Sequence, residues 1–268
     1  RLRVLSRLIQ GESIIVVAHI DAVLNKLVAP SIFKECSITI KQEDMVDLKD
    51  LATRLVLAGY KRENRVEAVG QFSIRGGIID FFPPNSDNPY RIELFDDEID
   101  SIRTFDVESQ RSIDVVQSVS LSPVKEILIL DEYRRKIIQN LSEELSRTIE
   151  NDKLNKKIKE NVEDKFGGYI NEIEENLYIS NMDMVIPYIP EEYISSILDY
   201  FNSDSLVFID EPKRIEERAE SLKEQFLMRY SDVLEMGEVL PGHRGINFEY
   251  EDLIEEIKKK ICIVNTAI

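Results

Sequence analysis

Four short runs between residues 71 and 105 constrain the fold of this chain more than any other feature. The runs are rich in β-branched and aromatic residues, and Pro-rich or Asp-rich turns such as Pro83-Pro84-Asn85 separate them. Strand-length runs at this spacing predict an antiparallel meander. The predicted strands are Gln71–Arg75, Gly77–Phe82, Tyr90–Phe95 and Ile99–Phe105.

A helix is expected just ahead of the meander, from Asp47 to Ala58. Asp47 has the short acceptor side chain typical of an N-cap. Gly59 stands where a left-handed C-terminal cap is expected. A further strand is predicted over Ser37–Ile40.

The sequence on both sides of the meander predicts an α/β layer. Ile14–Ala18 is a continuous apolar run, typical of a strand that is buried on both faces. Leu206–Ile209 and Ile261–Val264 are two further predicted core strands. We therefore expect an α/β fold with an α+β insertion, divided into the C-terminal part of an α/β layer (1–36), the antiparallel domain (37–121) and a helical and α/β return (122–268).

The composition argues against several classes of function. Among 268 residues, 51 are acidic and 34 basic, and the net charge of −17 disfavours unaided binding to phosphate backbones. Cys36 and Cys262 lie too far apart for a disulfide framework or a metal knuckle, and their thiols fit a reducing cytosol. No apolar run approaches the ~20 residues of a membrane span. We expect a cytoplasmic protein without a membrane partner and, because Arg1 rather than Met stands first, a piece of a longer polypeptide.

Catalytic motifs are not recognisable in the sequence. Asp210 and Glu211 end an apolar run in the manner of a degenerate Walker B pair, but no phosphate-binding G-x-x-x-x-G-K-[ST] loop accompanies them. His19 is expected to pack or to cap a helix, and His243 to lie in a solvated loop. We therefore predict no catalytic residue, no metal site and no cofactor for this chain.

The strand Tyr90–Phe95 carries the candidate binding residues. The period-2 alternation of a strand places Arg91, Glu93 and Phe95 on the face opposite its apolar residues. An aromatic ring beside a guanidinium group is a combination that is enriched among interface hot spots. This face is therefore a candidate protein-binding surface.

The neighbouring strand Gln71–Arg75 adds to that surface. The same alternation exposes Gln71, Ser73 and Arg75, and the two exposed sets together form a surface of Arg, Phe and Glu. The alternative interpretation is that Phe95 closes the end of the core and that the arginines form ordinary surface ion pairs.

Two long motifs in this region carry a family resemblance. Residues 70–83, GQFSIRGGIIDFFP, and 89–106, PYRIELFDDEIDSIRTFD, resemble the signature of the UvrB-homology module. The excision-repair protein UvrB and the transcription-repair coupling factors (the Mfd family) share this module. The ending Ser109–Ser112 is more similar to the Mfd family, and Ser73 stands where UvrB usually has an additional arginine.

The resemblance implies that the meander docks UvrA through Arg75, Arg91 and Phe95, with Glu93 as a weaker fourth contact. It also implies that the surrounding layer is a degenerate RecA/helicase-like fold without a working nucleotide site. The parent protein would be an ATP-dependent DNA translocase that displaces RNA polymerase. Its ATP, magnesium and DNA would be bound by other domains of the parent chain, which are themselves expected partners of this fragment.

Two alternatives remain open at this stage. The module is either a UvrB-like ATP-dependent enzyme that remodels damaged DNA, or a packing module that masks the UvrA surface within its own chain. The helical region 131–176 matches the family poorly, and no function is transferred to it.

Overall fold

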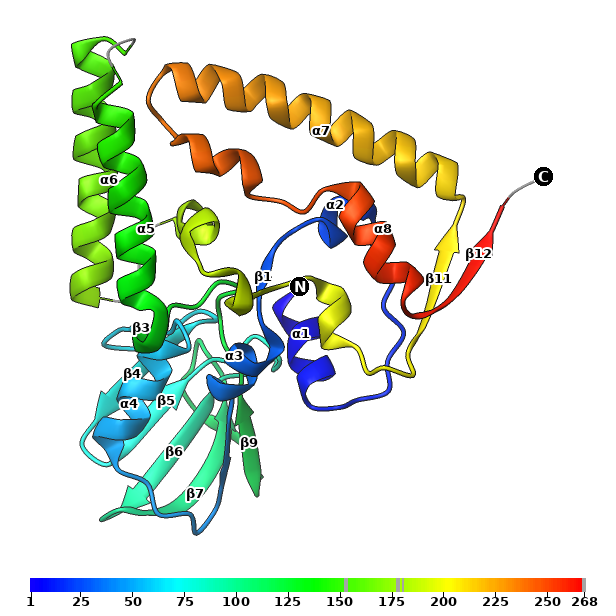
Figure 1. The fold of residues 1–268 in the computed structure, drawn as a ribbon. Coiled ribbons are helices and arrows are strands. Elements are labelled where there is room, and N and C mark those ends of the chain that lie inside the picture. Colours follow the sequence, from blue (N-terminus) through cyan, green and yellow to red (C-terminus); the bar gives the residue numbers. More distant parts are fainter. Residues whose placement is uncertain (152–153, 177–178, 180, 267–268) are drawn as a thin grey trace. The chain divides into compact units, whose positions relative to one another are not determined.

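The computed structural model describes residues 1–151, 154–176, 179 and 181–266. The chain forms two compact units (Figure 1). The first comprises Arg1–Ile14 and Pro30–Leu128, and the second comprises Ile15–Ala29 and Ile129–Ile268. The chain therefore passes from the first unit to the second and back before the meander begins.

The first unit contains a six-stranded sheet in the order β3-β4-β5-β6-β7-β8. Neighbouring strands are antiparallel except for the parallel pair β3–β4. Strands β4 to β7 are neighbours in the same order as in the sequence, which confirms the predicted meander. The strands are β3 (Lys61–Arg62), β4 (Gln71–Arg75), β5 (Ile78–Phe81), β6 (Tyr90–Phe95), β7 (Glu98–Phe105) and β8 (Ser112–Val116).

One face of this sheet is apolar and buried. Phe72 lies opposite Phe81 across β4 and β5. Ile79 lies opposite Ile92 across β5 and β6. All four side chains are fully buried, and each such burial stabilises the fold by about 1.5–3 kcal/mol.

Helix α4 (Leu48–Leu57) belongs to the same unit and has the predicted ends. One carboxylate oxygen of Asp47 accepts hydrogen bonds from the backbone N–H groups of Lys49 and Asp50, at 2.6 and 3.3 Å. Gly59 follows the helix with a φ of +87°, a conformation that glycine adopts without steric cost. The remaining elements of the unit are α1 (Leu2–Ile9), α3 (Pro30–Glu35) and the antiparallel pair of β2 (Ile38–Lys41) and β9 (Ser118–Leu121).

The second unit is mainly helical and contains two short sheets. β1 and β10 pair in antiparallel fashion, and β11 and β12 pair in parallel. Its α-helices are α2 (Ile20–Val23), α5 (Asp131–Ile149), α6 (Lys156–Asn176), α7 (Pro212–Glu235) and α8 (Tyr250–Lys258). Its strands are β1 (Leu27–Val28), β10 (Ile194–Ser195), β11 (Leu206–Asp210) and β12 (Ile261–Asn265). Its 3-10 helices are η1 (Met182–Tyr188), η2 (Glu191–Tyr193), η3 (Ile197–Tyr200) and η4 (Pro241–Gly245).

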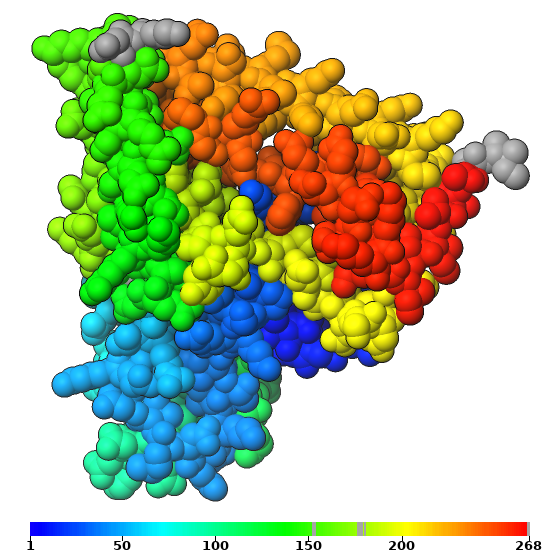
Figure 2. Space-filling view, viewed as in Figure 1, coloured from blue at the N-terminus to red at the C-terminus, as the bar shows by residue number. Residues whose placement is uncertain are grey.

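The parallel pair β11–β12 confirms two predicted strands but not their complete burial. Val207, Ile209 and Cys262 pack against a core formed by residues of α7 and α8, among others. The alternate residues face away from this core, so that Leu206 and Phe208 are 57% and 59% exposed. Strand β12, in red, lies at the surface in Figure 2. A two-stranded sheet with helices against one face leaves its other face open.

The prediction of a buried strand over Ile14–Ala18 is wrong. The segment forms no strand, and the side chains of Ile15 and Val17 are 95% and 93% exposed. A β-branched run becomes a strand only where another strand takes up its backbone hydrogen bonds. No strand in the described part of the chain pairs with this run.

The two histidine predictions have different outcomes. His19 occupies the N-cap position of α2 as expected, but its side chain is exposed and makes no capping hydrogen bond to the described residues of the helix. The prediction for His243 is wrong. His243 is buried in η4, where its Nε2 lies 3.1 Å from the carbonyl oxygen of Met184. Its ring also contacts Phe166 and Tyr188. The Pro-Gly segment forms a compact turn, and the imidazole of His243 points into the interior. The carbonyl oxygen of Met184 and the rings of Phe166 and Tyr188 surround it there.

Candidate functional site

The polar face of the six-stranded sheet carries a row of in-register residues. Ser73 of β4 lies opposite Asp80 of β5, and Asp80 lies opposite Arg91 of β6. The row continues to Arg103 of β7. Residues directly opposite each other in antiparallel strands project from the same face. This row therefore brings one acidic and two basic side chains together.

Asp80 is the centre of the row and is only 1% exposed. Arg91 binds it through two hydrogen bonds, from Nε to Oδ1 at 2.7 Å and from Nη2 to Oδ2 at 2.9 Å. Arg75 donates from Nη2 to the same Oδ2 at 2.7 Å. A buried carboxylate is costly unless it is paired and hydrogen-bonded, and these two arginines supply both conditions.

The turn between β4 and β5 allows Arg75 to reach this carboxylate. Arg75 and Ile78 are paired across two glycines, and Gly76 has a φ of +61°. A side chain on Gly77 would place its Cβ 3.0 Å from the carbonyl oxygen of Leu94 in β6. The glycine pair therefore permits both the tight turn and the close approach of β6.

The two arginines differ in exposure. The Arg91 side chain is 15% exposed, and its guanidinium carbon lies 4.6 Å from the centre of the Phe105 ring. Its Nη1 donates to the carbonyl oxygen of Gln110 at 3.3 Å. The hydrogen bonds to Asp80 raise the pKa of Arg91 above its ordinary value. Arg75 is 50% exposed and presents much more of its side chain to solvent.

Glu93 lies on the same face as Arg91 but makes different contacts. It accepts a hydrogen bond from the hydroxyl of Ser101 at 3.3 Å. Nη2 of Arg103 lies 3.6 Å from the same carboxylate oxygen, Oε2. Glu93 is half-buried, and its charge is directed along the sheet toward β7.

Phe95 ends β6 and is 75% exposed. It pairs with Glu98 across the two-residue turn, and Glu98 forms a β-bridge with Met45, which is 71% exposed. Phe95 therefore does not close the core. Its neighbourhood at the end of the sheet contains a second exposed apolar side chain, that of Met45.

The prediction that Ser73 is exposed is wrong. Its side chain is 1% exposed, and its hydroxyl oxygen has no hydrogen-bond partner among the described residues. Ser73 lies beside Asp80 in the register. The alternation of the strand gave the correct face for Ser73 but not its burial.

The structure thus brings Arg75 and Arg91 onto one carboxylate and leaves Phe95 separate at the end of the strand. The sequence reasoning missed Asp80, Arg103 and Met45. A single acidic residue within the apolar strand Ile78–Phe81 was a usable signal for Asp80, since an isolated buried carboxylate requires a basic partner. Met45 gave no such signal, because its bridge to β7 joins residues far apart in the sequence.

The Walker B-like pair at the end of β11 is engaged in ordinary contacts. Oδ1 of Asp210 accepts a hydrogen bond from Nδ2 of Asn265 at 2.8 Å. Glu211 forms an ion pair with Arg214 at 2.7 Å and has a φ of +52°. Among the residues that the structure describes, no group of three His, Cys, Asp or Glu side chains is arranged to hold a metal ion. None of the described helices is long and apolar enough to cross a membrane.

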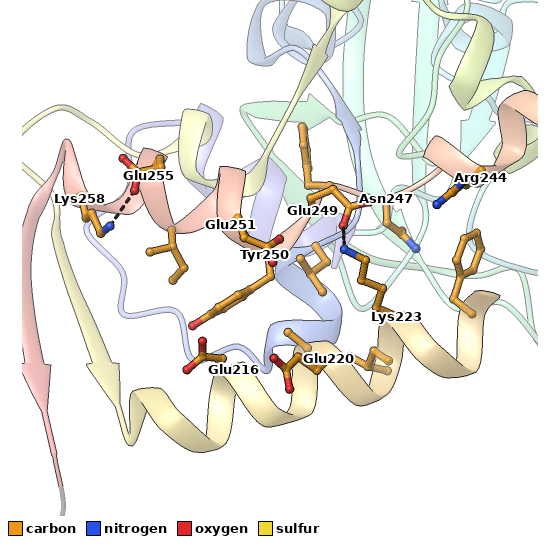
Figure 3. A pocket seen from close by; sticks show the side chains of 16 residues that line it. Glu216, Glu220, Lys223, Arg244, Asn247, Glu249, Tyr250, Glu251, Glu255 and Lys258 are labelled. Atoms are coloured by element: carbon orange, nitrogen blue, oxygen red, sulfur yellow. Dashed lines mark hydrogen bonds and ion pairs between the residues drawn. The ribbon is translucent and has the colours of Figure 1, made fainter. Parts of the chain in front are cut away.

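A pocket of about 340 Å³ lies between α7 and α8 in the second unit (Figure 3). Its lining is mixed, with apolar side chains and charges of both signs. Lys223 forms an ion pair with Glu249 at 2.6 Å, and Lys258 forms one with Glu255 at 2.7 Å. The basic and acidic groups of the wall thus partly neutralise one another, and we assign no ligand to this pocket.

Comparisons with known proteins agree with the motifs on the sheet. A family model described as the UvrB interaction domain matches residues 38–127. The transcription-repair-coupling factor of Bacillus subtilis (strain 168) is 34% identical over 264 residues, which are 97% of this chain and 22% of that protein. The factor of Staphylococcus aureus (strain MRSA252) is 34% identical over 260 residues, or 95% of this chain and 22% of that protein.

The chain spans about a fifth of the length of these relatives. The match covers both compact units, whereas the family model lies within the first unit. The resemblance predicted from the two motifs is therefore confirmed: residues 38–127 match the family model of the UvrB interaction domain, and the chain is similar to a segment of the transcription-repair-coupling factors.

Proposed function

We propose that this chain is the UvrA-docking segment of a bacterial transcription-repair coupling factor and that it carries no catalytic activity of its own. The observation that carries the proposal is the polar face of the meander, where Arg75 and Arg91 share Asp80 and Phe95 is 75% exposed. This face lies within the matched UvrB interaction domain.

The proposed contacts divide according to exposure. Phe95 supplies an apolar anchor, and Arg75 supplies hydrogen-bond donors at the surface. Arg91 supplies positive charge from a more buried position. Glu93 is a weaker contact, because Ser101 and Arg103 already engage its carboxylate. Arginine and aromatic side chains of this kind carry most of the binding energy at many interfaces.

The fragment is proposed to act within a larger enzyme. Other domains of the parent would bind ATP, magnesium, DNA and RNA polymerase, and the parent would translocate on DNA in the cytoplasm. The parallel pair β11–β12, with helices on one face, is compatible with the edge of a degenerate RecA-like layer. We retain the division into 1–36, 37–121 and 122–268 as a proposal for how that layer and its insertion are arranged in the chain.

Masking of the same surface within the parent chain is compatible with this proposal. Two exposed apolar side chains at the end of the sheet, Phe95 and Met45, favour a covering partner, which is either UvrA or another domain. The competing enzymatic function requires nucleotide binding, and here Asp210 and Glu211 bind Asn265 and Arg214 instead. Measurable ATP turnover by the purified chain, abolished by Asp210→Asn, would favour the enzyme.

Binding of the purified chain to purified, immobilised UvrA tests the proposal directly. The unaltered chain is expected to be retained, and Phe95→Ala is expected to be lost from the matrix. Phe208→Ala is the matched control, since it removes an exposed phenyl ring from the other compact unit. Equal retention of all three proteins would contradict docking through this face.

A further inference from the structure

The buried carboxylate of Asp80 is not among the proposed UvrA contacts, although both candidate arginines donate hydrogen bonds to it. It lies on β5, between the strand that carries Arg75 and the strand that carries Arg91. Its two oxygens receive three hydrogen bonds, each between 2.7 and 2.9 Å long. Resting on the proposed function, we propose that Asp80 is a positioning residue that fixes Arg75 and Arg91 in the orientation in which they meet UvrA.

Electrostatics supports this role. The two guanidinium groups carry like charges and are both bonded to the same oxygen, Oδ2. Without an anion between them, they repel each other and separate. The carboxylate at 1% exposure has little water to screen it, so its attraction for both groups is strong.

Because Asp80 restricts the arginine side chains before binding, less side-chain entropy is lost when UvrA binds. A free arginine loses much rotamer freedom when a partner immobilises it. Asp80 already holds Arg91 by a two-point contact and holds one nitrogen of the half-exposed Arg75. Ordering in the free protein lowers the entropic cost of association, which is the general basis of preorganisation.

The opposite role is also physically possible and predicts the opposite sign. If Asp80 merely competes with acidic groups of UvrA for the arginines, its neutralisation releases them and strengthens binding. Asp80→Asn distinguishes the two roles, because asparagine keeps the shape of the side chain and removes the charge. Asp87→Asn is the matched control, since Asp87 has an 86% exposed side chain in the same unit.

The first arm of the experiment measures affinity for UvrA by titration. Asp80→Asn is expected to raise Kd at least about tenfold, in line with the loss of a charged hydrogen-bonded partner. Asp87→Asn is expected to leave Kd within about twofold of the original. An unchanged or lower Kd for Asp80→Asn, with the circular-dichroism spectrum intact, overturns the proposal.

The second arm separates positioning from a purely structural effect. In the Arg75→Ala background, Asp80→Asn is expected to raise Kd by a smaller factor than in the unaltered chain, because one of the two positioned groups is gone. The same tenfold rise in both backgrounds would show that Asp80 does not act through Arg75. Such a result also overturns the proposal.

The third arm observes the arginines without UvrA. In a nitrogen-15 NMR spectrum, the Nε–H group of Arg91 is expected to exchange slowly with water and to lose this protection in Asp80→Asn. Unchanged protection overturns the positioning role. If the unaltered chain fails to bind UvrA at all, the proposed function fails, and this arm alone then decides whether Asp80 orders the arginines.

Discussion

The six-stranded sheet of the first unit and the β11–β12 sheet of the second unit are both built from β-branched and aromatic runs, but they differ in how far their faces are covered. In the first unit, consecutive hairpins supply each of β4 to β7 with neighbours, and the polar face is filled by arginines that share a buried acid. In the second unit, β11 has β12 as its partner, and the outer face exposes Leu206 and Phe208. In an antiparallel meander, short turns join each strand to its neighbour, so that all strands come from a short stretch of sequence. Parallel strands must be joined by long crossover connections.

The comparison also shows two kinds of exposed phenylalanine. Phe95 ends β6 of the six-stranded sheet, the same strand that carries Arg91. Phe208 stands on the open apolar face of a two-stranded sheet. We interpret the first as a binding residue and the second as part of an uncovered packing face. The predictions below test this distinction, beginning with the largest expected effect.

Removing a phenyl ring from each sheet should reveal the difference in burial. Phe72→Ala is expected to lower the free energy of unfolding by about 3–5 kcal/mol, because Phe72 is fully buried. Phe208→Ala is expected to lower it by less than about 1 kcal/mol, because Phe208 is 59% exposed. Urea unfolding followed by circular dichroism measures both values. Similar losses of stability for the two variants would contradict the claim that Phe72 is a core residue and Phe208 a surface residue.

The two arginines of the first sheet should differ in the same manner. Arg91→Ala is expected to cost about 2–3 kcal/mol of stability, because it leaves Asp80 buried with Arg75 as its remaining charged partner. Arg75→Ala is expected to cost less than about 1 kcal/mol, since its side chain is half-exposed. Thermal unfolding of both variants checks the order. A larger loss of stability for Arg75→Ala would contradict the assignment of Arg91 as the main partner of Asp80.

The two exposed phenyl rings should differ in binding. Phe95→Ala is expected to weaken affinity for UvrA at least about thirtyfold, which corresponds to the ~2 kcal/mol of a typical hot spot. Its stability should change little, because Phe95 is 75% exposed. Phe208→Ala should leave the affinity unchanged. Isothermal titration calorimetry with purified UvrA makes the measurement, and a loss of affinity in Phe208→Ala would show that the open face binds UvrA as well.

The smallest expected effect concerns pH and the second unit. Burial lowers the pKa of His243 below its ordinary value of 6.5, so the unfolded chain binds a proton more readily than the folded one. This unit should lose stability as the pH falls from about 6.5 toward the lowered pKa. Hydrogen exchange of the amides in η1 and η4 at pH 7.5 and 5.5 tests this. His243→Gln should weaken the pH dependence, and an unchanged dependence would assign it to other groups.

Much of the first unit followed from local patterns. Alternation located β4 to β7, and the cap residues located the ends of α4. The same alternation placed Arg91, Glu93 and Phe95 on one strand face. It failed for Ser73, because alternation gives the face of a strand on which a side chain lies and not whether that face is open to solvent.

The second unit was less predictable. The segment Ile14–Ala18 has the composition of a core strand and is exposed. The Pro-Gly segment around His243 has the composition of a solvated loop and is packed inside. In both cases the composition of the segment indicates which conformations it can adopt. Whether it is buried depends on the strands and side chains that other parts of the chain place against it.

The amino-acid sequence by itself determined the meander, the helix ends, the UvrB-type motifs and the identity of the candidate docking residues, because these depend on spacing within short segments. The tertiary structure alone decided that Arg75 and Arg91 converge on Asp80, that Ser73 is buried and that Phe95 remains exposed. Strand register sets these contacts, and register joins residues through the backbone hydrogen bonds of neighbouring strands rather than through their order in the chain.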